Sequence, residues 1–196
     1  MEMLSTLLLA FLSIVIVNNL VLTKFLGICP FLGVSGRFDM AFGMGMAVTF
    51  VMTMSGTLTW MVDHWLLTPL HLQVTQYICY ILIIAAAVQL VEMYLRKFFP
   101  KLYESFGIFL PLITTNCCIL GLCLFLNLWE INSLTHAVVL SFGGGIGFTI
   151  AICIMAGIRE HLELADVPDC IKGAPITLIT AGILSLAFMG FAGMIK

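Results

Sequence analysis

The residues best suited to chemistry in this sequence are two cysteines that stand beside helix-disrupting residues in apolar surroundings. Cys29 is followed directly by Pro30 in the stretch KFLGICPFLGVSG, and Cys117 follows the residues TTN. A free cysteine often packs as a small hydrophobe, so packing would explain either thiol taken singly. Thiolates also bind soft metal centres, iron–sulfur clusters in particular. A [2Fe–2S] or [4Fe–4S] cluster normally takes four cysteines.

The composition places these cysteines in a membrane protein. Of the 196 residues, 62% are hydrophobic and 9% are charged, with a net charge of −2, and the mean hydropathy is +1.17. Soluble domains are roughly 45–50% apolar and about 25% charged. The sequence therefore predicts one integral membrane domain over residues 1–196, with membrane lipid around it and no nucleic-acid partner.

Six apolar segments are candidates for membrane spans, because a helix needs about 20 residues to cross a bilayer. They cover residues 3–35, 40–61, 77–95, 105–127, 134–156 and 175–195. The first is too long for one simple span, so it is predicted to be tilted, broken or partly re-entrant. An acid stands where a secretory signal would be basic, so the N-terminal stretch is interpreted as the first membrane segment.

The placement of basic residues predicts the orientation of these spans. With six spans, both termini lie on one side of the membrane, and most basic residues fall in loops on the other: Arg37, Arg96, Lys97, Lys101, Arg159 and Lys172. Such residues are concentrated in cytoplasmic loops, so both termini are predicted to be external. Trp60, Trp65 and Trp129 fall at the external ends of spans, as interfacial aromatic residues do.

Three sequence matches recur in the same order in the two halves of the chain. AFGMGMAVT at 41–49 resembles SFGGGIGFT at 141–149, LIIAAAVQLVEM at 82–93 resembles LITAGILSLAFM at 178–189, and CPFLG at 29–33 resembles CCILG at 117–121. Each half, about 1–97 and 98–196, holds three spans, so the second copy inserts upside down. The predicted fold class is an all-α polytopic membrane protein, with six transmembrane helices in two inverted three-helix repeats.

Both repeats carry helix-disrupting residues beside their first cysteine. Pro30 removes a backbone donor and Gly27 and Gly33 loosen the helix, so the backbone is predicted to be broken there. Gly107 and Pro111 precede the second cysteine. Irregular backbone at membrane depth is tolerated only inside protein or beside a cavity. Helices one and four are therefore predicted to be broken, with Cys29 and Cys117 at related positions near mid-membrane, where such folds carry their sites.

Cys29 and Cys117 are the candidate metal and cofactor ligands on this reasoning. Two symmetric thiolates make half of a four-cysteine site, so a second protein has to supply the rest. Cys118 and Cys123 could complete a site within the chain instead, but their counterparts in the repeat are a proline and a serine. Packing or loop positions are expected for Cys79, Cys153 and Cys170.

Other motifs have structural explanations. GGGIG at 143–147 lacks the strand-to-helix context of a nucleotide loop, and close helix packing explains it better. Asn18, Asn19 and Asn116 are expected to cap half-helices, donate toward cluster sulfurs or bond between helices. The histidines at 64, 71, 136 and 161 have no metal-ligand spacing.

Several motifs together resemble the RnfA/NqrE family of membrane subunits: VNNLVLTKFLGICPFLGVS, LYESFGIFLPLITTNCCILG, AGIRE, ADVP and ITAGILSLAFMGF. The resemblance covers essentially the whole chain. It is closer to the subunit of the Rnf ferredoxin:NAD⁺ oxidoreductase complex than to that of the related sodium-pumping NADH:quinone reductase.

This resemblance implies a role in electron transfer and no catalysis by the isolated chain. In that family the subunit pairs with an oppositely inserted RnfE-like homologue, and each contributes two half-helix cysteines to one intramembrane [2Fe–2S] cluster. The matching ligands here are Cys29 and Cys117, although Cys118 stands where relatives usually have alanine. The cluster would relay electrons between iron–sulfur partners on the ferredoxin/NAD side and flavin-bearing subunits. The complex lies in the bacterial cytoplasmic (inner) membrane and translocates Na⁺ or H⁺.

Two other interpretations remain open on the sequence. A small secondary transporter also uses inverted repeats and broken helices, with the cysteines merely packing. The second interpretation is an assembly protein of a membrane complex that holds no cofactor. Measuring whether the protein contains a cofactor would distinguish both interpretations from an electron carrier.

Overall fold

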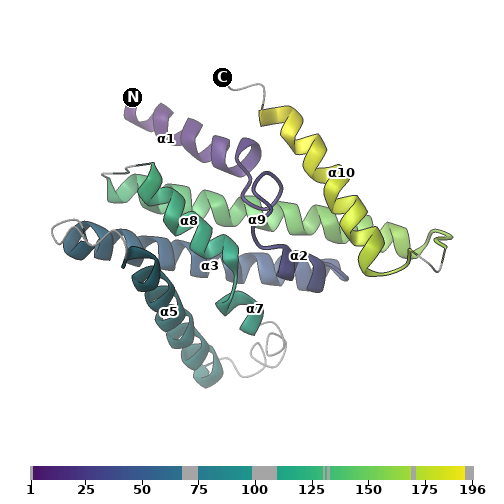
Figure 1. The fold of residues 1–196 in the computed structure, drawn as a ribbon, viewed down its shortest axis with the longest axis horizontal. Helices are drawn as coiled ribbons and strands as arrows, with labels where there is room; N and C mark the ends of the chain where they lie inside the picture. Colours follow the sequence, from purple (N-terminus) through teal and green to yellow (C-terminus); the bar gives the residue numbers. More distant parts are fainter. Residues whose placement is uncertain are drawn as a thin grey trace.

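Two long helices form the centre of the molecule. A computed structural model describes residues 2–67, 75–98, 110–129, 131, 133–168 and 171–192, and the regular structure within them is entirely helical. Helices α3 (Phe38–Val62) and α9 (Leu134–Glu163) lie side by side and run in opposite directions (Figure 1). Their mutual contact is the most extensive between any two described elements.

Shorter helices border this pair, and two π-helical turns continue α1 and α3. In chain order they are α1 (Glu2–Leu12), η1 (Ser13–Val17), α2 (Ile28–Gly33), η2 (Asp63–Leu67), α5 (Gln76–Phe98), α7 (Leu110–Thr114), α8 (Cys117–Leu128) and α10 (Ala174–Ala192). Helices α5 and α8 pack mainly on α3, whereas α1 and α10 lie on the side of α9 (Figure 1).

The helices match a membrane environment in length and composition. Among the described residues, three helices are long and apolar enough to cross a bilayer: Phe38–Leu66, Gln76–Met93 and Leu134–Glu163. Shorter apolar helices cover Ser5–Val17, Leu112–Leu128 and Ala174–Gly190. The predicted all-helical membrane class is confirmed, and each of the six predicted apolar segments contains helix.

The first and fourth apolar segments are both interrupted. The first leaves its helix after Val17 and resumes one at Ile28, and the fourth changes helix between α7 and α8. The predicted break in the stretch that holds Gly27 and Pro30 lies at Gly27 and not at Pro30. Pro30 lies in the first turn of α2, where a helical N–H has no intrahelical acceptor in any case. The disruption lies upstream of it, where Phe25 and Gly27 have φ values of 54° and 80°.

The contact between α3 and α9 is reciprocal. A Cβ atom added at Gly45 would lie 2.6 Å from Thr149 Cγ2, and one added at Gly145 would lie 2.6 Å from Thr49 Cα. The two threonine hydroxyl oxygens are 3.1 Å apart, and each hydroxyl also donates to the carbonyl of the glycine four residues back in its own helix. Small residues therefore let the two backbones approach, as the glycine-rich motifs predicted.

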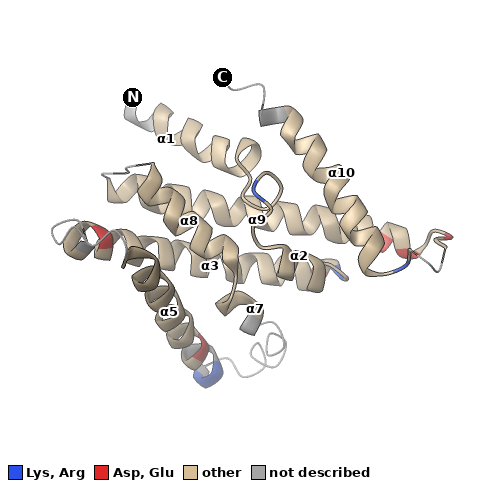
Figure 2. Ribbon diagram, in the orientation of Figure 1, with Lys and Arg blue, Asp and Glu red and all other residues tan. Residues whose placement is uncertain are grey.

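The ends of the central pair differ in character, and Figure 2 shows charged residues gathered at helix ends and connections. At one end the Phe38 N–H donates to Glu160 Oε1 across 3.0 Å, and Arg159 donates to a carbonyl at the end of α2. At the opposite end Trp60 Nε1 donates to the Ile131 carbonyl across 2.6 Å. A basic residue thus marks one end of the central pair and an aromatic residue marks the other.

Gly145→Ala and Gly157→Ala form a matched pair on α9 that tests the central contact. Nothing lies within 4 Å of a Cβ atom at Gly157, whereas the backbone of Thr49 blocks one at Gly145. We expect Gly145→Ala to lower stability by about 1–3 kcal/mol through overpacking. Gly157→Ala should raise stability by up to about 1 kcal/mol through helix propensity. Size-exclusion chromatography of detergent-purified protein after heating measures both, and equal losses would contradict the close approach of α3 and α9.

Candidate functional site

The two interrupted segments meet at Gly27 and Cys117. The Gly27 N–H donates to Cys117 Sγ across 2.9 Å, which joins residues 90 positions apart in the chain. Cys29 follows two residues later, and two residues of backbone span at most about 7 Å. The side chains of Cys29 and Cys117 are both exposed. The structure therefore brings the two candidate ligands into one region with both thiols open.

Position 27 at this junction requires glycine. Its φ of +80° is a left-handed conformation that L side chains rarely adopt, and an added Cβ atom would lie 3.1 Å from Cys118 Cβ and from the Phe148 ring. The absence of a side chain lets the backbone N–H come close to the start of α8 and reach the sulfur. The sequence singled out Gly27 as a helix breaker and gave no sign that its N–H serves as a donor.

Asn19 fixes the irregular stretch that precedes α2. Its Oδ1 accepts from the Val21 and Leu22 N–H groups, and its Nδ2 donates to the carbonyls of Gly147 and Val15. The residue is fully buried. Both ends of its amide are therefore used, and the bond to Gly147 ties the interruption to α9. This confirms the expectation that one of these asparagines bonds between helices.

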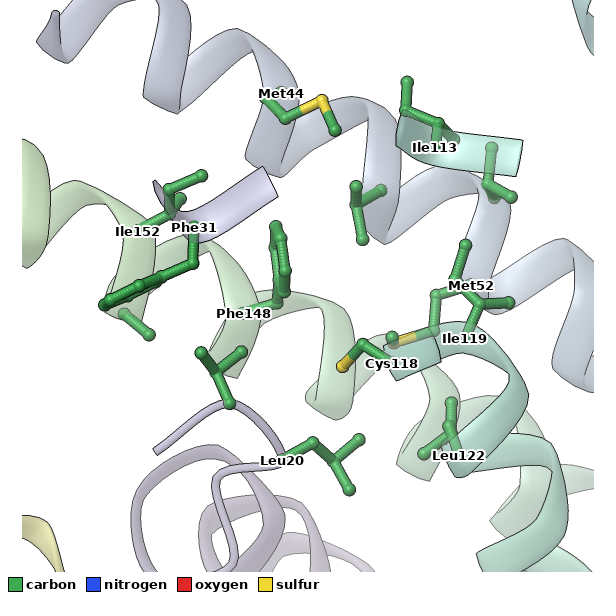
Figure 3. Packing of buried hydrophobic residues seen from close by; sticks show 14 of the residues in the cluster. Leu20, Phe31, Met44, Met52, Ile113, Cys118, Ile119, Leu122, Phe148 and Ile152 are labelled. Carbon is green, nitrogen blue, oxygen red and sulfur yellow. The ribbon is translucent and has the colours of Figure 1, made fainter. Parts of the chain in front are cut away.

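The two adjacent thiols at the start of α8 face different surroundings. Cys117 is exposed, whereas Cys118 has no exposed surface. Figure 3 shows Cys118 among apolar side chains that include Met52, Leu122 and Phe148. Only Cys117 of this pair is open to a metal or a partner protein.

The other cysteines are less accessible or lie elsewhere. Cys123 is buried, and Cys79 and Cys153 are half-buried. Cys170 lies outside the described residues. The expected packing roles of Cys79 and Cys153 agree with their places in the apolar core, where both pack against its buried side chains.

Asn116 caps α8 immediately before Cys117. Its Oδ1 accepts from the Cys118 N–H across 3.0 Å, so the expected capping role is confirmed. Its Nδ2 is buried and has no hydrogen-bond acceptor among the described residues. A buried donor of this kind is rare in folded proteins and calls for an explanation.

Cys29 and Cys117 are the residues at this junction that could bind a soft metal. Cys117 is the first residue of α8, and its Sγ accepts from the Gly27 N–H. Within the described ranges no group of three or more His, Cys, Asp or Glu residues could hold a metal ion. The chain thus presents two open thiols with donors around one of them.

A cavity beside the first interruption was not foreseen. Its volume is about 520 Å³, and it lies between η1, the irregular stretch and α8, with Lys24 and Asn18 among its lining residues. Lys24 Nζ lies 5.7 Å from the centroid of the Phe125 ring, within range of a cation–π interaction. The lysine within the first apolar segment was the available signal, since charges in such segments usually mark functional places.

The fold and this junction define an α-helical membrane protein whose interrupted helices present paired thiols. A family model for the Rnf-Nqr subunit, described as a membrane protein, matches residues 7–195. The chain belongs to this Rnf-Nqr family, and the predicted resemblance is confirmed.

The similar proteins cover nearly the full chain. A protein of Syntrophotalea carbinolica is 55% identical over 189 residues, 96% of this chain and 97% of its own. One from Azoarcus sp. is 53% identical over 179 residues, 91% of this chain and 92% of its own. One from Vibrio vulnificus is 49% identical over 182 residues, which are 93% of this chain and 94% of its own. The name of each describes one of the subunits of an ion-translocating oxidoreductase complex.

Thiol labelling of the separately purified chain tests this description of the junction. We expect N-ethylmaleimide to modify Cys29 and Cys117 at least about tenfold faster than Cys118 and Cys123, because a buried thiol reacts only when the structure opens locally. Fragmentation mass spectrometry distinguishes the adjacent pair, and denatured protein should label at all four positions. Faster labelling of Cys118 than of Cys117 would contradict the assignment of the open thiol.

Proposed function

We propose that the protein is a membrane subunit of an ion-translocating oxidoreductase complex and holds half of an intramembrane [2Fe–2S] cluster through Cys29 and Cys117. The names of its relatives support the first part. The observation that carries the second is the Gly27 N–H to Cys117 Sγ bond, which joins two interrupted segments beside a pair of open thiols.

The residues present fit a cluster that is shared with a second protein. A [2Fe–2S] cluster takes four thiolates, and two open thiols occur at this junction. The remaining ligands would come from an RnfE-like homologous membrane subunit, inserted in the opposite orientation. When bound, the cluster would supply a one-electron carrier within the hydrocarbon, which is about 30 Å thick.

The chain's own residues would set the properties of this site. The Gly27 N–H and the start of α8 would face the negative charge of a cluster bound through the Cys117 sulfur. Phe148 and Cys118 are buried near the junction, and a dry environment would strengthen these electrostatic interactions. Donors and burial are the means by which proteins adjust cluster potentials.

The proposal includes six spans in two inverted repeats, about 1–97 and 98–196, within one membrane domain. The reciprocal contacts of Gly45 with Thr149 and of Gly145 with Thr49 support it. A two-fold axis requires that if one residue contacts the equivalent of a second, the second contacts the equivalent of the first. These four residues occupy matching places in the two repeated motifs.

The proposed setting follows the charge distribution. Basic residues would face the cytoplasm and both termini would lie outside, in the bacterial cytoplasmic (inner) membrane. Electrons would pass between iron–sulfur subunits on the ferredoxin/NAD side and flavin-bearing subunits, and the complex would couple this flow to Na⁺ or H⁺ movement.

A small secondary transporter is the second candidate function. The cavity of about 520 Å³ beside the interrupted first segment favours it, since transporters place their sites at such interruptions. Iron content decides between the two.

The complex purified anaerobically with its membrane partners should contain iron and acid-labile sulfide at this site. Cys29→Ser and Cys117→Ser should each abolish the corresponding EPR signal, because each removes one of four ligands. Cys118→Ala and Cys153→Ser are matched controls that should leave the signal intact. An iron-free complex that still moves a solute would exclude the proposed electron carrier and favour the transporter.

Reporter fusions test the proposed orientation. Alkaline phosphatase, which is active only outside the cytoplasm, should be active when fused after Lys196 and inactive when fused within residues 96–101. A fluorescent protein that matures only in the cytoplasm should give the opposite pattern. Activity at both positions would rule out the six-span arrangement.

A further inference from the structure

We propose that Asn116 is a positioning residue for the cluster, whose Nδ2–H donates to the Cys117 sulfur when that sulfur is a metal ligand. The sulfur would then accept two N–H groups, one from Gly27 and one from Asn116. This inference rests on the proposed function, because it requires a cluster at Cys29 and Cys117.

The first step is the fixed orientation of the Asn116 amide. The side chain is 5% exposed, and its Oδ1 is held by the Cys118 N–H at 3.0 Å. The amide cannot turn over without losing the helix cap, so a bond to the Cys117 sulfur requires that sulfur to move towards Nδ2 when it binds the cluster. That nitrogen is buried without an acceptor among the described residues, which is unfavourable unless an acceptor arrives.

The second step is that capping does not require this nitrogen. Serine and aspartate cap helices about as well as asparagine does, because only the side-chain oxygen takes part. Asn19, at the other interruption, uses both ends of its amide within the chain. Of these two buried asparagines, Asn116 is the one with an unused donor; Ser55 Oγ and Thr59 Oγ1 on α3 are the other buried polar atoms without a partner among the described residues.

The third step is the shared neighbour of Asn116 and Cys117. A Cβ atom added at Gly27 would lie 3.2 Å from Asn116 Oδ1, and the Gly27 N–H lies 2.9 Å from Cys117 Sγ. The amide and the sulfur thus flank the same residue. A neutral thiol is a weak acceptor, whereas a metal-bound thiolate carries negative charge and accepts strongly.

Such a bond has a measurable consequence for the cluster. Hydrogen bonds to sulfur favour the more negatively charged reduced state, so they raise the reduction potential. Removal of the Asn116 donor should therefore lower the potential without removing a ligand.

The test uses Asn116→Ser in the intact complex, because serine keeps the helix cap and removes the amide nitrogen. In a potentiometric EPR titration, the ratio of reduced to oxidised cluster at the wild-type midpoint should fall about threefold to tenfold, tenfold being 59 mV for one electron. Asn18→Ser is the matched control, since Asn18 lies at the other interruption and bonds Ser13 Oγ. Its ratio should not change.

A second measurement separates a direct bond from a structural effect. With asparagine labelled by ¹⁵N in its side-chain amide only, pulsed EPR of the reduced complex should detect a weakly coupled nitrogen that is absent in Asn116→Ser and also in Asn116→Asp, which keeps the shape of the cap. A merely structural role would not move this coupling.

The outcomes distinguish the inference from the function on which it rests. An intact cluster with an unchanged midpoint in Asn116→Ser, or a ¹⁵N coupling that survives in Asn116→Asp, would overturn the role of Asn116 alone. Absence of a cluster signal in the unaltered complex would overturn the proposed function. Should Asn116→Ser fail to assemble, the coupling in the unaltered complex and its loss in Asn116→Asp decide.

Discussion

Backbone groups that leave a helix inside a bilayer have to find hydrogen-bond partners within the protein, because hydrocarbon offers none. Two asparagines meet this demand at the interruptions. Asn19 holds the irregular stretch before α2 and ties it to α9, and Asn116 closes the start of α8. The open thiols depend on this satisfied backbone, since without it Gly27 would not reach Cys117.

The sequence was most informative where residue type and chain order suffice. The apolar segments located the helices, and the glycine motifs anticipated close helix packing, which the structure shows between α3 and α9. The two cysteine motifs anticipated a junction between segments 90 residues apart. Each of these inferences depends on hydrophobicity or on repetition, and both can be counted along a chain.

The features that the sequence did not predict depend on the direction in which a chemical group points. Adjacent cysteines look alike in a sequence, yet successive residues of a helix point about 100° apart, so Cys117 opens outward while Cys118 is buried. Pro30 was counted with Gly27 among the residues that break the helix, but in the first turn its missing N–H costs nothing. The Gly27 N–H could not be predicted as a donor to Cys117, because every residue except proline has a backbone N–H and the sequence does not show which one will be used.

The reciprocal contact of α3 and α9 also bears on biosynthesis. Thr49 and Thr149 are 100 positions apart, and at 5–20 residues per second the ribosome needs roughly 5–20 s to make the chain between them. During that interval the nascent first half displays its small-residue face to lipid or to the insertion machinery. A chain arrested between the halves would keep that face open, which would make it a ready target for membrane proteases.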